Sequence, residues 1–202
     1  MVEFRLSRDK LVNVLFRAII YLAIVCHVAS CQPASQPTGT AITNVTVIDA
    51  VNGVRANHTV VYDGDEIISV GPAGMPADVA ETIDGSGKYV IPGLWDFHVH
   101  LSFDERFTDD MPALFLSYGV TSVRDTGGLI HKIQPIVEKM RAVEAVAPRV
   151  WFAGPLLDGN LVVYDGDSRP EIGVKNATPE EARATIRALK EQGVDFIKIY
   201  EM

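Results

Sequence analysis

The chain has 202 residues, of which 48% are hydrophobic and 22% charged, and its formal net charge is −8. This composition is typical of a globular protein with one sizeable core or two small ones. An acidic chain without a basic stripe is not expected to bind nucleic acid. Both cysteines, Cys26 and Cys31, lie near the N-terminus, so we expect no disulfide or cysteine metal cluster in the body of the protein.

The first 40 residues have the features of an export signal followed by a tether. Basic side chains precede an apolar stretch over residues 18–28, which is shorter than the roughly 20 residues of a membrane-spanning helix. The segment Val28-Ala29-Ser30-Cys31 resembles a bacterial lipobox. We therefore expect residues 1–30 to be a lipoprotein signal peptide, Cys31 to carry a lipid, and residues 31–40 to form a flexible tether.

A lipid on Cys31 would anchor the protein to the periplasmic side of a bacterial membrane, the outer membrane in a Gram-negative cell. Ordinary signal cleavage and an uncleaved N-terminal anchor are the alternatives.

Residues 41–88 predict the N-terminal part of a small β-sandwich domain. Short β-branched runs alternate with turn residues such as Asn52-Gly53. The predicted strands are 42–48, 59–62, 66–70 and 81–84. Consecutive hairpins of this kind make a small antiparallel sheet or half-sandwich. Catalytic residue types are not concentrated here, and His58 is expected to be exposed.

From residue 89 onward, apolar strands alternate with helical patterns. The predicted strands are 89–99, 120–125, 149–153 and 194–200, and the predicted helices are 109–118, 129–146 and 178–192. This order predicts a parallel sheet covered by helices, which is an α/β fold. Four such strands are half of an eight-stranded barrel of roughly 250 residues. We therefore expect residues 89–202 to be the first half of a (β/α)8 TIM-type barrel, incomplete as it stands.

The first of these strands ends on His98 and His100. Side chains alternate along a strand, so both histidines are expected on one face, where two imidazoles can chelate a divalent metal. A His-x-His pair also arises by chance where a strand leaves a sheet. Asp96 is expected on the same face, either supporting a ligand histidine or making a buried structural hydrogen bond.

The last predicted strand carries Lys198 in its middle. A lysine cation is costly to bury in a parallel strand that is covered on both faces. Either the strand ends here and Lys198 reaches solvent or an acid, or burial leaves it as a neutral amine. A neutral amine can react with carbon dioxide to form a carbamate. Such a group could bridge two metal ions that His98 and His100 help to hold.

Two further features lie at the ends of predicted strands. Arg124 and Asp125 end the second strand, on the rim where barrel active sites are built. They either support the site or only brace the barrel through an ion pair. Residues 156–177 show no clear period and are a candidate substrate loop on length alone.

The segments 61–71, 90–100, 119–128 and 193–199 make the chain resemble the N-terminal half of a metal-dependent amidohydrolase of the imidazolonepropionase-like group. The resemblance covers residues 41–202, and the His-x-His motif with its Pro92-Gly93 lead is its most specific part. It implies a (β/α)8 barrel beside a β-sandwich, with His98 and His100 as metal ligands and Lys198 as a carboxylated lysine. That lysine resembles the binuclear branch, which implies two zinc ions and includes dipeptidases that cleave Xaa-Pro or Xaa-Arg bonds.

Enzymes of this family need two further histidines and a general-base aspartate, which these 202 residues do not supply. The two histidines and one lysine are too few for a centre of two zinc ions, since a catalytic zinc usually has three protein ligands. We therefore expect a hydrolase of C–N bonds, with a small-molecule or dipeptide substrate, of which this chain is a truncated and inactive fragment. Its exposed strand edges would favour self-association. The competing hypothesis is a lipid-anchored binding or interaction protein without catalysis.

Overall fold

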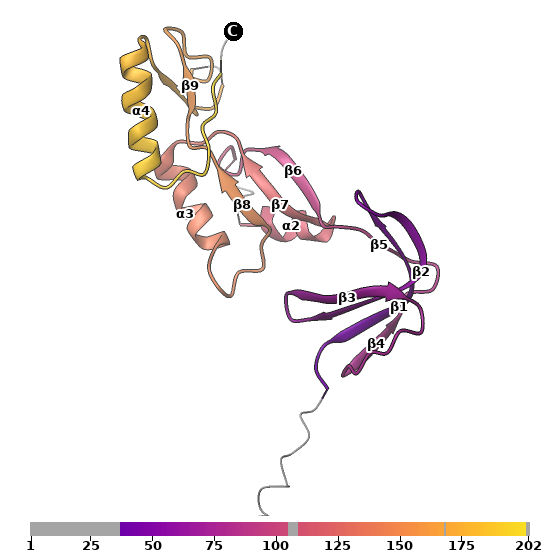
Figure 1. Ribbon diagram of the computed structural model, residues 1–202. Coiled ribbons are helices and arrows are strands. Elements are labelled where there is room, and N and C mark those ends of the chain that lie inside the picture. The colour runs from indigo at the N-terminus through magenta and orange to yellow at the C-terminus, as the bar shows by residue number, and fades with distance from the viewer. Residues whose placement is uncertain (1–36, 105–108, 168, 201–202) are drawn as a thin grey trace, which may run out of the picture. The chain divides into compact units, whose positions relative to one another are not determined.

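The computed structural model describes residues 37–104, 109–167 and 169–200, so the expected signal peptide and Cys31 lie outside the described residues. The chain divides into two compact units, one ending at Val90 and the other beginning at Ile91 (Figure 1). Within the described ranges, no helix is long and apolar enough to cross a membrane.

The first unit is a five-stranded sheet in which β3, β2, β1 and β4 are neighbours in that order and β5 also pairs with β1. Its strands are β1 Thr40–Asp49, β2 Gly53–Asp63, β3 Glu66–Pro72, β4 Glu81–Asp84 and β5 Tyr89–Val90. The pairs β1–β2 and β2–β3 are antiparallel, as the hairpin pattern predicts. β4 and β5, in contrast, run parallel to β1.

The prediction of a purely antiparallel sheet is therefore wrong for β4. Pro72 ends β3, and residues 73–80 carry the chain across to the other side of β1 instead of turning it back in a hairpin. The NH groups of Ala80 and Glu81 donate to the Gly39 carbonyl, which fixes the start of β4 beside the start of β1.

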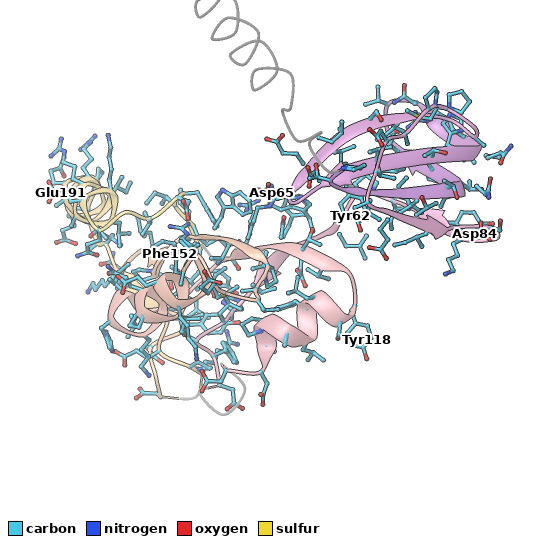
Figure 2. All side chains as sticks on the ribbon, turned by 90° about the horizontal axis from the view of Figure 1, so that it is seen from below. Tyr62, Asp65, Asp84, Tyr118, Phe152 and Glu191 are labelled. Carbon is cyan, nitrogen blue, oxygen red and sulfur yellow. The ribbon has the colours of Figure 1, made fainter. Side chains whose placement is uncertain are left out.

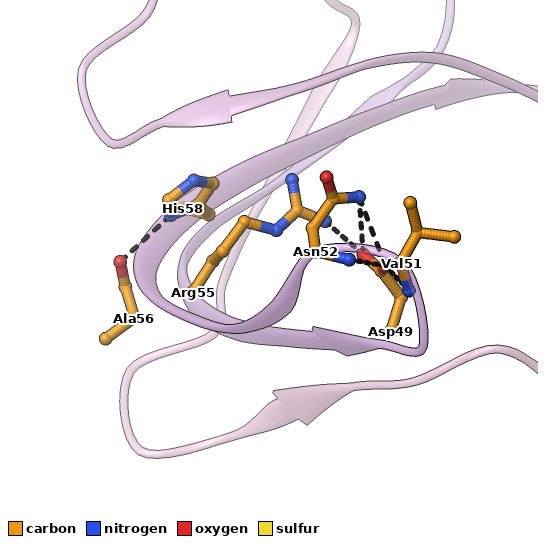
Figure 3. Close-up of polar contacts among 6 residues, drawn as sticks. All are labelled: Asp49, Val51, Asn52, Arg55, Ala56 and His58. Atoms are coloured by element: carbon orange, nitrogen blue, oxygen red, sulfur yellow. Dashed lines mark hydrogen bonds and ion pairs between the residues drawn. The ribbon is translucent and has the colours of Figure 1, made fainter.

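The turn between β1 and β2 is held by Asp49 (Figure 3). Its carboxylate accepts hydrogen bonds from the NH groups of Val51 and Asn52, at 2.9 and 2.7 Å, and pairs with the Arg55 guanidinium. These donors, the Asn52 NH first, lower the pKa of Asp49 to about 2. His58 is partly buried rather than exposed, with Nδ1 lying 2.9 Å from the Ala56 carbonyl oxygen.

The second unit is built on a parallel sheet with the order β6-β7-β8. Its first elements are β6 Leu94–Val99, α2 Met111–Ser117, β7 Val120–Asp125, α3 Ile130–Met140 and β8 Arg149–Phe152. The core lies between α3 and one face of this sheet, where Phe115 of α2 also packs. Figure 2 labels Phe152, the last residue of β8, and Tyr118, which follows α2. The parallel sheet with helices packed on it confirms the predicted α/β class.

The predicted strand over 89–99 is interrupted. Tyr89–Val90 pairs with β1 of the first unit, whereas β6 begins only at Leu94. Between them Pro92 has no NH for a ladder. Gly93 passes so close to β7 that a Cβ there would lie 2.0 Å from the Thr121 Oγ1 atom. The backbone therefore changes sheets at this Pro-Gly pair.

The helix predicted over 129–146 ends early, at Met140. The residues that follow have no core face to bury, since Val143 is 98% exposed. Arg141 instead turns toward the sheet, where its guanidinium donates to the Val150 carbonyl oxygen at 2.8 Å and to the Asp195 carboxylate at 2.7 Å.

Two short parallel strands, β9 Leu156–Asp158 and β10 Gly173–Lys175, lie in the segment predicted to be a loop. Helix α4, Pro179–Glu191, then begins as the sequence predicts, with the Thr178 Oγ1 accepting from the Glu181 NH at 3.2 Å. The Glu181 carboxylate accepts from the NH of Ala177, one residue earlier than in a standard capping box.

The predicted strand over 194–200 forms only in part. The Leu157 NH donates to the Lys198 carbonyl and the Tyr200 NH to the Leu157 carbonyl, which makes a single parallel bridge between Leu157 and Ile199. The segment that pairs with residues 194–200 is itself interrupted between β8 and β9. There Gly154 has a φ of +72°, and Pro155 has no NH to donate. A continuous ladder therefore cannot form on this side.

Candidate metal centre

His98 and His100 lie together at the C-terminal end of β6. Their ring centroids are 5.3 Å apart and the rings are inclined by 71°. His98 is exposed and His100 is partly buried. The two imidazoles that the sequence singles out are therefore neighbours with access to solvent.

An irregularity in β6 decides which side chains share a face. Asp96 pairs with Val123 and Val99 pairs with Asp125, so β6 has one residue more than β7 between these two pairs. An extra residue of this kind is a β-bulge, and it reverses the alternation of faces. Val99 packs into the core, so its neighbours His98 and His100 lie on the opposite face of the sheet.

The same irregularity places Asp96 differently from the expectation. By its pairing with Val123, Asp96 lies on the core side of the sheet and not on the face of the histidines. Its carboxylate accepts a hydrogen bond from the His98 NH at 3.1 Å. Of the two roles that the sequence left open for Asp96, this contact is a structural hydrogen bond to the backbone of a candidate ligand.

The ring of His100 is held by a backbone carbonyl. Its Nδ1 lies 3.0 Å from the Gly127 carbonyl oxygen. A carbonyl oxygen can only accept a hydrogen bond, so Nδ1 carries the proton in this contact and Nε2 keeps its lone pair. A side chain at Gly127 would not fit, since its Cβ would lie 3.1 Å from Cε1 of the same ring.

The pKa of His98 lies below its usual value. Partial burial is the largest cause, followed by the positive charges of His100 and Lys198, while Asp96 acts in the opposite direction. A lowered pKa favours the neutral imidazole, which is the form that binds a metal ion.

Lys198 is partly buried in the bridged segment after α4. No acid in the part of the chain that the structure describes forms an ion pair with it. The structure brings His98 and His100 together, and the place of Lys198 in a metal centre with them stays a prediction.

Arg124 and Asp125 are adjacent in β7 and lie on opposite faces. The Arg124 guanidinium stacks over Phe97 and Phe196, at 5.8 and 4.4 Å from the ring centroids. Its charge also contributes to the lowered pKa of His98. Arg124 is therefore on the histidine face of the sheet.

Asp125 is fully buried and accepts from the NH groups of Leu101 and Gly127. Burial raises its pKa to about 6, although both hydrogen bonds act to lower it. The ion pair considered between Arg124 and Asp125 is absent from the described structure. Neighbouring side chains on a strand point apart, so hydrogen bonds and cation–π contacts brace this region instead.

Sequence reasoning missed the aromatic lining of the histidine face. Trp95 stacks on Trp151 with a centroid distance of 4.6 Å and on Phe97 at 5.1 Å. A hollow of about 270 Å³ is lined by Trp95, Arg124, Trp151, Asp195 and Phe196. The role of the Gly127 carbonyl was missed too, although the Gly127-Gly128 pair signals a close backbone approach.

The donor set fits a divalent metal only in part. The two imidazoles are nitrogen donors of the kind that zinc accepts, and a carboxylated Lys198 would add carboxylate oxygens. Among the described residues, however, no three or more His, Cys, Asp or Glu side chains are grouped so that they could hold a metal ion. A complete centre therefore needs donors from outside the described residues.

Comparison with known proteins identifies enzyme relatives. No protein-family model matches the chain. A dihydroorotase of Trichlorobacter lovleyi is 46% identical over 55 residues, which are 27% of this chain and 13% of that enzyme. An imidazolonepropionase of Rubrobacter xylanophilus is 33% identical over 76 residues, or 35% of this chain and 18% of that enzyme.

Solved structures match a larger part of the chain. A Bifidobacterium longum protein, provisionally classed as a prolidase, is 30% identical with a TM-score of 0.66, and the match covers 80% of this chain and 40% of that one. A prolidase complexed with N-methylphosphonate-L-proline is 25% identical with a TM-score of 0.63, covering 80% of this chain and 46% of that one. The chain thus spans less than half the length of these proteins. Its homologues and structural neighbours are hydrolases of the amidohydrolase superfamily that act on C–N bonds.

Proposed function

We propose that the chain carries part of the metal centre of a metal-dependent hydrolase that acts on C–N bonds. His98 and His100 would be the ligands from β6 for two zinc ions, and Lys198, carboxylated on Nζ, would supply a further ligand. The observation that supports this best is the imidazole pair, in which the His100 Nδ1 is committed to the Gly127 carbonyl and Nε2 is left for a metal. The superfamily of the relatives generally uses divalent metals.

When bound, a divalent metal lowers the pKa of its water ligand to about 7 and polarises the carbonyl group that is attacked. The protein's own residues hold and orient these partners. Asp96 and Asp125 are poor candidates for the proton acceptor, because their carboxylates accept hydrogen bonds from backbone NH groups. We therefore assign the general base to a residue outside the described structure.

The proposed substrate is a small molecule or a dipeptide such as Xaa-Pro or Xaa-Arg. It rests on the prolidase-like structural neighbours, one of which is complexed with a phosphonate derivative of L-proline. The proposed architecture is the first half of a (β/α)8 barrel beside part of a β-sandwich. A purely non-catalytic binding protein is not favoured by these relatives.

Zinc binding by the chain tests the proposal. We expect zinc to bind in calorimetric titrations, and the variants His98→Ala and His100→Ala each to lose this binding. The matched controls are His58→Ala and His131→Ala, which remove imidazoles on β2 and on the surface of α3 and should leave zinc binding unchanged. Equal zinc affinity in all four variants would refute the assignment.

Carboxylation of Lys198 has its own test. Intact-mass and ¹³C NMR measurements after incubation with zinc and ¹³C-bicarbonate should detect one added carboxylate. The variant Lys198→Arg should lack it, because a guanidinium does not form the carbamate. An unmodified Lys198 in the zinc-loaded protein would contradict the two-metal proposal.

We further propose that the protein is exported and anchored to a bacterial membrane through a lipid on Cys31. Metabolic labelling with a fatty acid should mark the wild-type protein in the membrane fraction. The variant Cys31→Ser should lose the label. Labelling that persists in Cys31→Ser would exclude this anchor.

A further inference from the structure

We propose that Asp125 is a positioning residue that fixes the tautomer and the ring orientation of His100, acting through Gly127. The inference rests on the proposed function only in treating His100 as a metal ligand. Asp125 does not contact the histidine ring in this scheme. It binds the NH of Gly127, the residue whose carbonyl group contacts the ring.

The carboxylate of Asp125 ties together the segments that follow β6 and β7. It is 0% exposed, and its two oxygens have different partners. Oδ2 accepts from the NH of Leu101, the residue directly after His100, and Oδ1 accepts from the NH of Gly127 at 3.1 Å. One side chain thus fixes the backbone on both sides of the imidazole.

The Gly127 residue is held from several directions. Its NH is bound by Asp125, and the next NH, that of Gly128, donates to the Gly154 carbonyl at 3.1 Å. A Cβ at Gly127 would meet Leu156 on one side and the His100 ring on the other, at 3.0 and 3.1 Å. The Gly127 carbonyl therefore has little freedom to turn away from the His100 Nδ1, 3.0 Å from it.

The chemistry of this arrangement gives His100 one tautomer. Both NH groups that Asp125 binds need an acceptor, and a carboxylate accepts on both oxygens. An asparagine accepts on one oxygen only, and its NH₂ group would face the other NH. The backbone would then shift, and the Gly127 carbonyl would move relative to Nδ1. Partners beyond the ligands orient the imidazole in metal sites in this way.

The test is the tautomer of His100, measured by long-range ¹H–¹⁵N correlation NMR on the full chain in detergent after removal of metal with a chelator. We expect the wild-type protein to hold the proton on Nδ1. In Asp125→Asn, the Nε2–H tautomer should rise to a comparable population. The matched control is Asp158→Asn, which alters another buried carboxylate that accepts from a backbone NH, that of Val163 at 3.0 Å, and should keep the wild-type ratio.

Two results would overturn the inference. One is a wild-type His100 with its proton on Nε2, a result that needs no variant. The other is an unchanged Nδ1–H fraction in a folded Asp125→Asn protein. If that variant does not fold, the tautomer of the wild-type protein alone decides, since a proton on Nε2 overturns the inference without any variant.

Zinc titration separates this inference from the proposed function. Loss of a residue that orients a ligand typically weakens metal binding by about 10- to 100-fold, and we expect that loss in Asp125→Asn but not in Asp158→Asn. If zinc binds equally with and without the imidazoles of His98 and His100, the proposed function fails, while the tautomer ratio still decides how His100 is positioned.

Discussion

Asp49 and Asp125 show how the surroundings of one side-chain type set its charge. Asp49 lies at a turn where NH groups and an arginine face it, and its pKa falls to about 2. Asp125 also accepts two backbone hydrogen bonds, yet burial dominates and raises its pKa to about 6. The direction of each pKa shift thus depends on whether desolvation, which raises the pKa, or hydrogen-bond donors, which lower it, have the larger effect.

The raised pKa of Asp125 predicts a pH dependence of stability. The folded state holds a proton on Asp125 up to about pH 6, whereas the unfolded chain releases it near the ordinary aspartate pKa of 3.8. The folded state therefore binds more protons in this window, and stability falls as the pH rises through it. Between about pH 5 and about pH 7.5, the free energy of unfolding of the wild type should fall by about 1 kcal/mol relative to Asp125→Asn.

Urea unfolding of both proteins at the two pH values measures this difference. The other titrating groups are common to both proteins and cancel in the comparison. A difference between the two proteins that does not change with pH would show that Asp125 does not titrate in this range.

The candidate ligands could be predicted from the sequence, but their surroundings could not. His98 and His100 share a face under any regular strand, and they flank Val99, which ends the bulge. Asp96 lies before the bulge, so strict alternation assigned it to the wrong face. A bulge depends on the register with β7, which the local sequence of β6 does not contain.

At the scale of helices and strands, the helix ends that carry capping residues could be predicted from the sequence. Thr178 and Glu181 start α4, and Gly193, with a φ of +80°, follows its end. Strand ends were less predictable, because they depend on neighbours. The break at Pro92-Gly93 follows from the close approach to Thr121, and the partial strand near Lys198 follows from the break between β8 and β9.

Replacing the N-cap residue of α4 tests whether this cap stabilises the start of the helix. Thr178→Ala removes the acceptor of the Glu181 NH and should lower the free energy of unfolding by about 1 kcal/mol. Thr178→Ser keeps a hydroxyl acceptor and should restore most of the loss. Chemical denaturation measures both variants, and equal stability of Thr178→Ala and wild type would show that the cap contributes nothing.

The close approach of Gly93 to β7 makes a second prediction. A Cβ at Gly93 would lie 2.0 Å from the Thr121 Oγ1, so Gly93→Ala forces the two strands apart and should cost about 1–3 kcal/mol or more. Thr121→Ala in the same protein should recover part of this loss. Gly159→Ala is the control, since nothing lies within 4 Å of its Cβ, and its change should stay within about 0.5 kcal/mol.

At the scale of the whole molecule, the histidine face of the second unit exposes large apolar side chains in the described structure. Trp95 and Phe97 are 41% and 57% exposed, although they lie on a parallel sheet, and such sheets are normally covered on both faces. In the described structure β6 pairs only with β7, so its other edge is open as well. Apolar faces and open edges of this kind favour contact with further polypeptide.

We therefore predict that the purified chain self-associates in a concentration-dependent manner. Phe97→Glu should weaken the association, because it places a charge on the exposed face. Val143→Glu is the matched control, since it adds the same charge at a site that is 98% exposed after α3. Sedimentation velocity measures the outcome, and a wild-type protein that stays monomeric over the whole concentration range would contradict it.

The stacked pair of Trp95 and Trp151 has an optical consequence. The protein contains only these two tryptophans, and their rings lie 4.6 Å apart on the face that carries Arg124. The indole emission of the whole protein therefore reports on this one face. Anything that covers it should shift the emission to shorter wavelength, and separation of the two rings should alter the near-ultraviolet circular dichroism. The two tryptophans thus report, without an added label, whether this face of the sheet is exposed or covered.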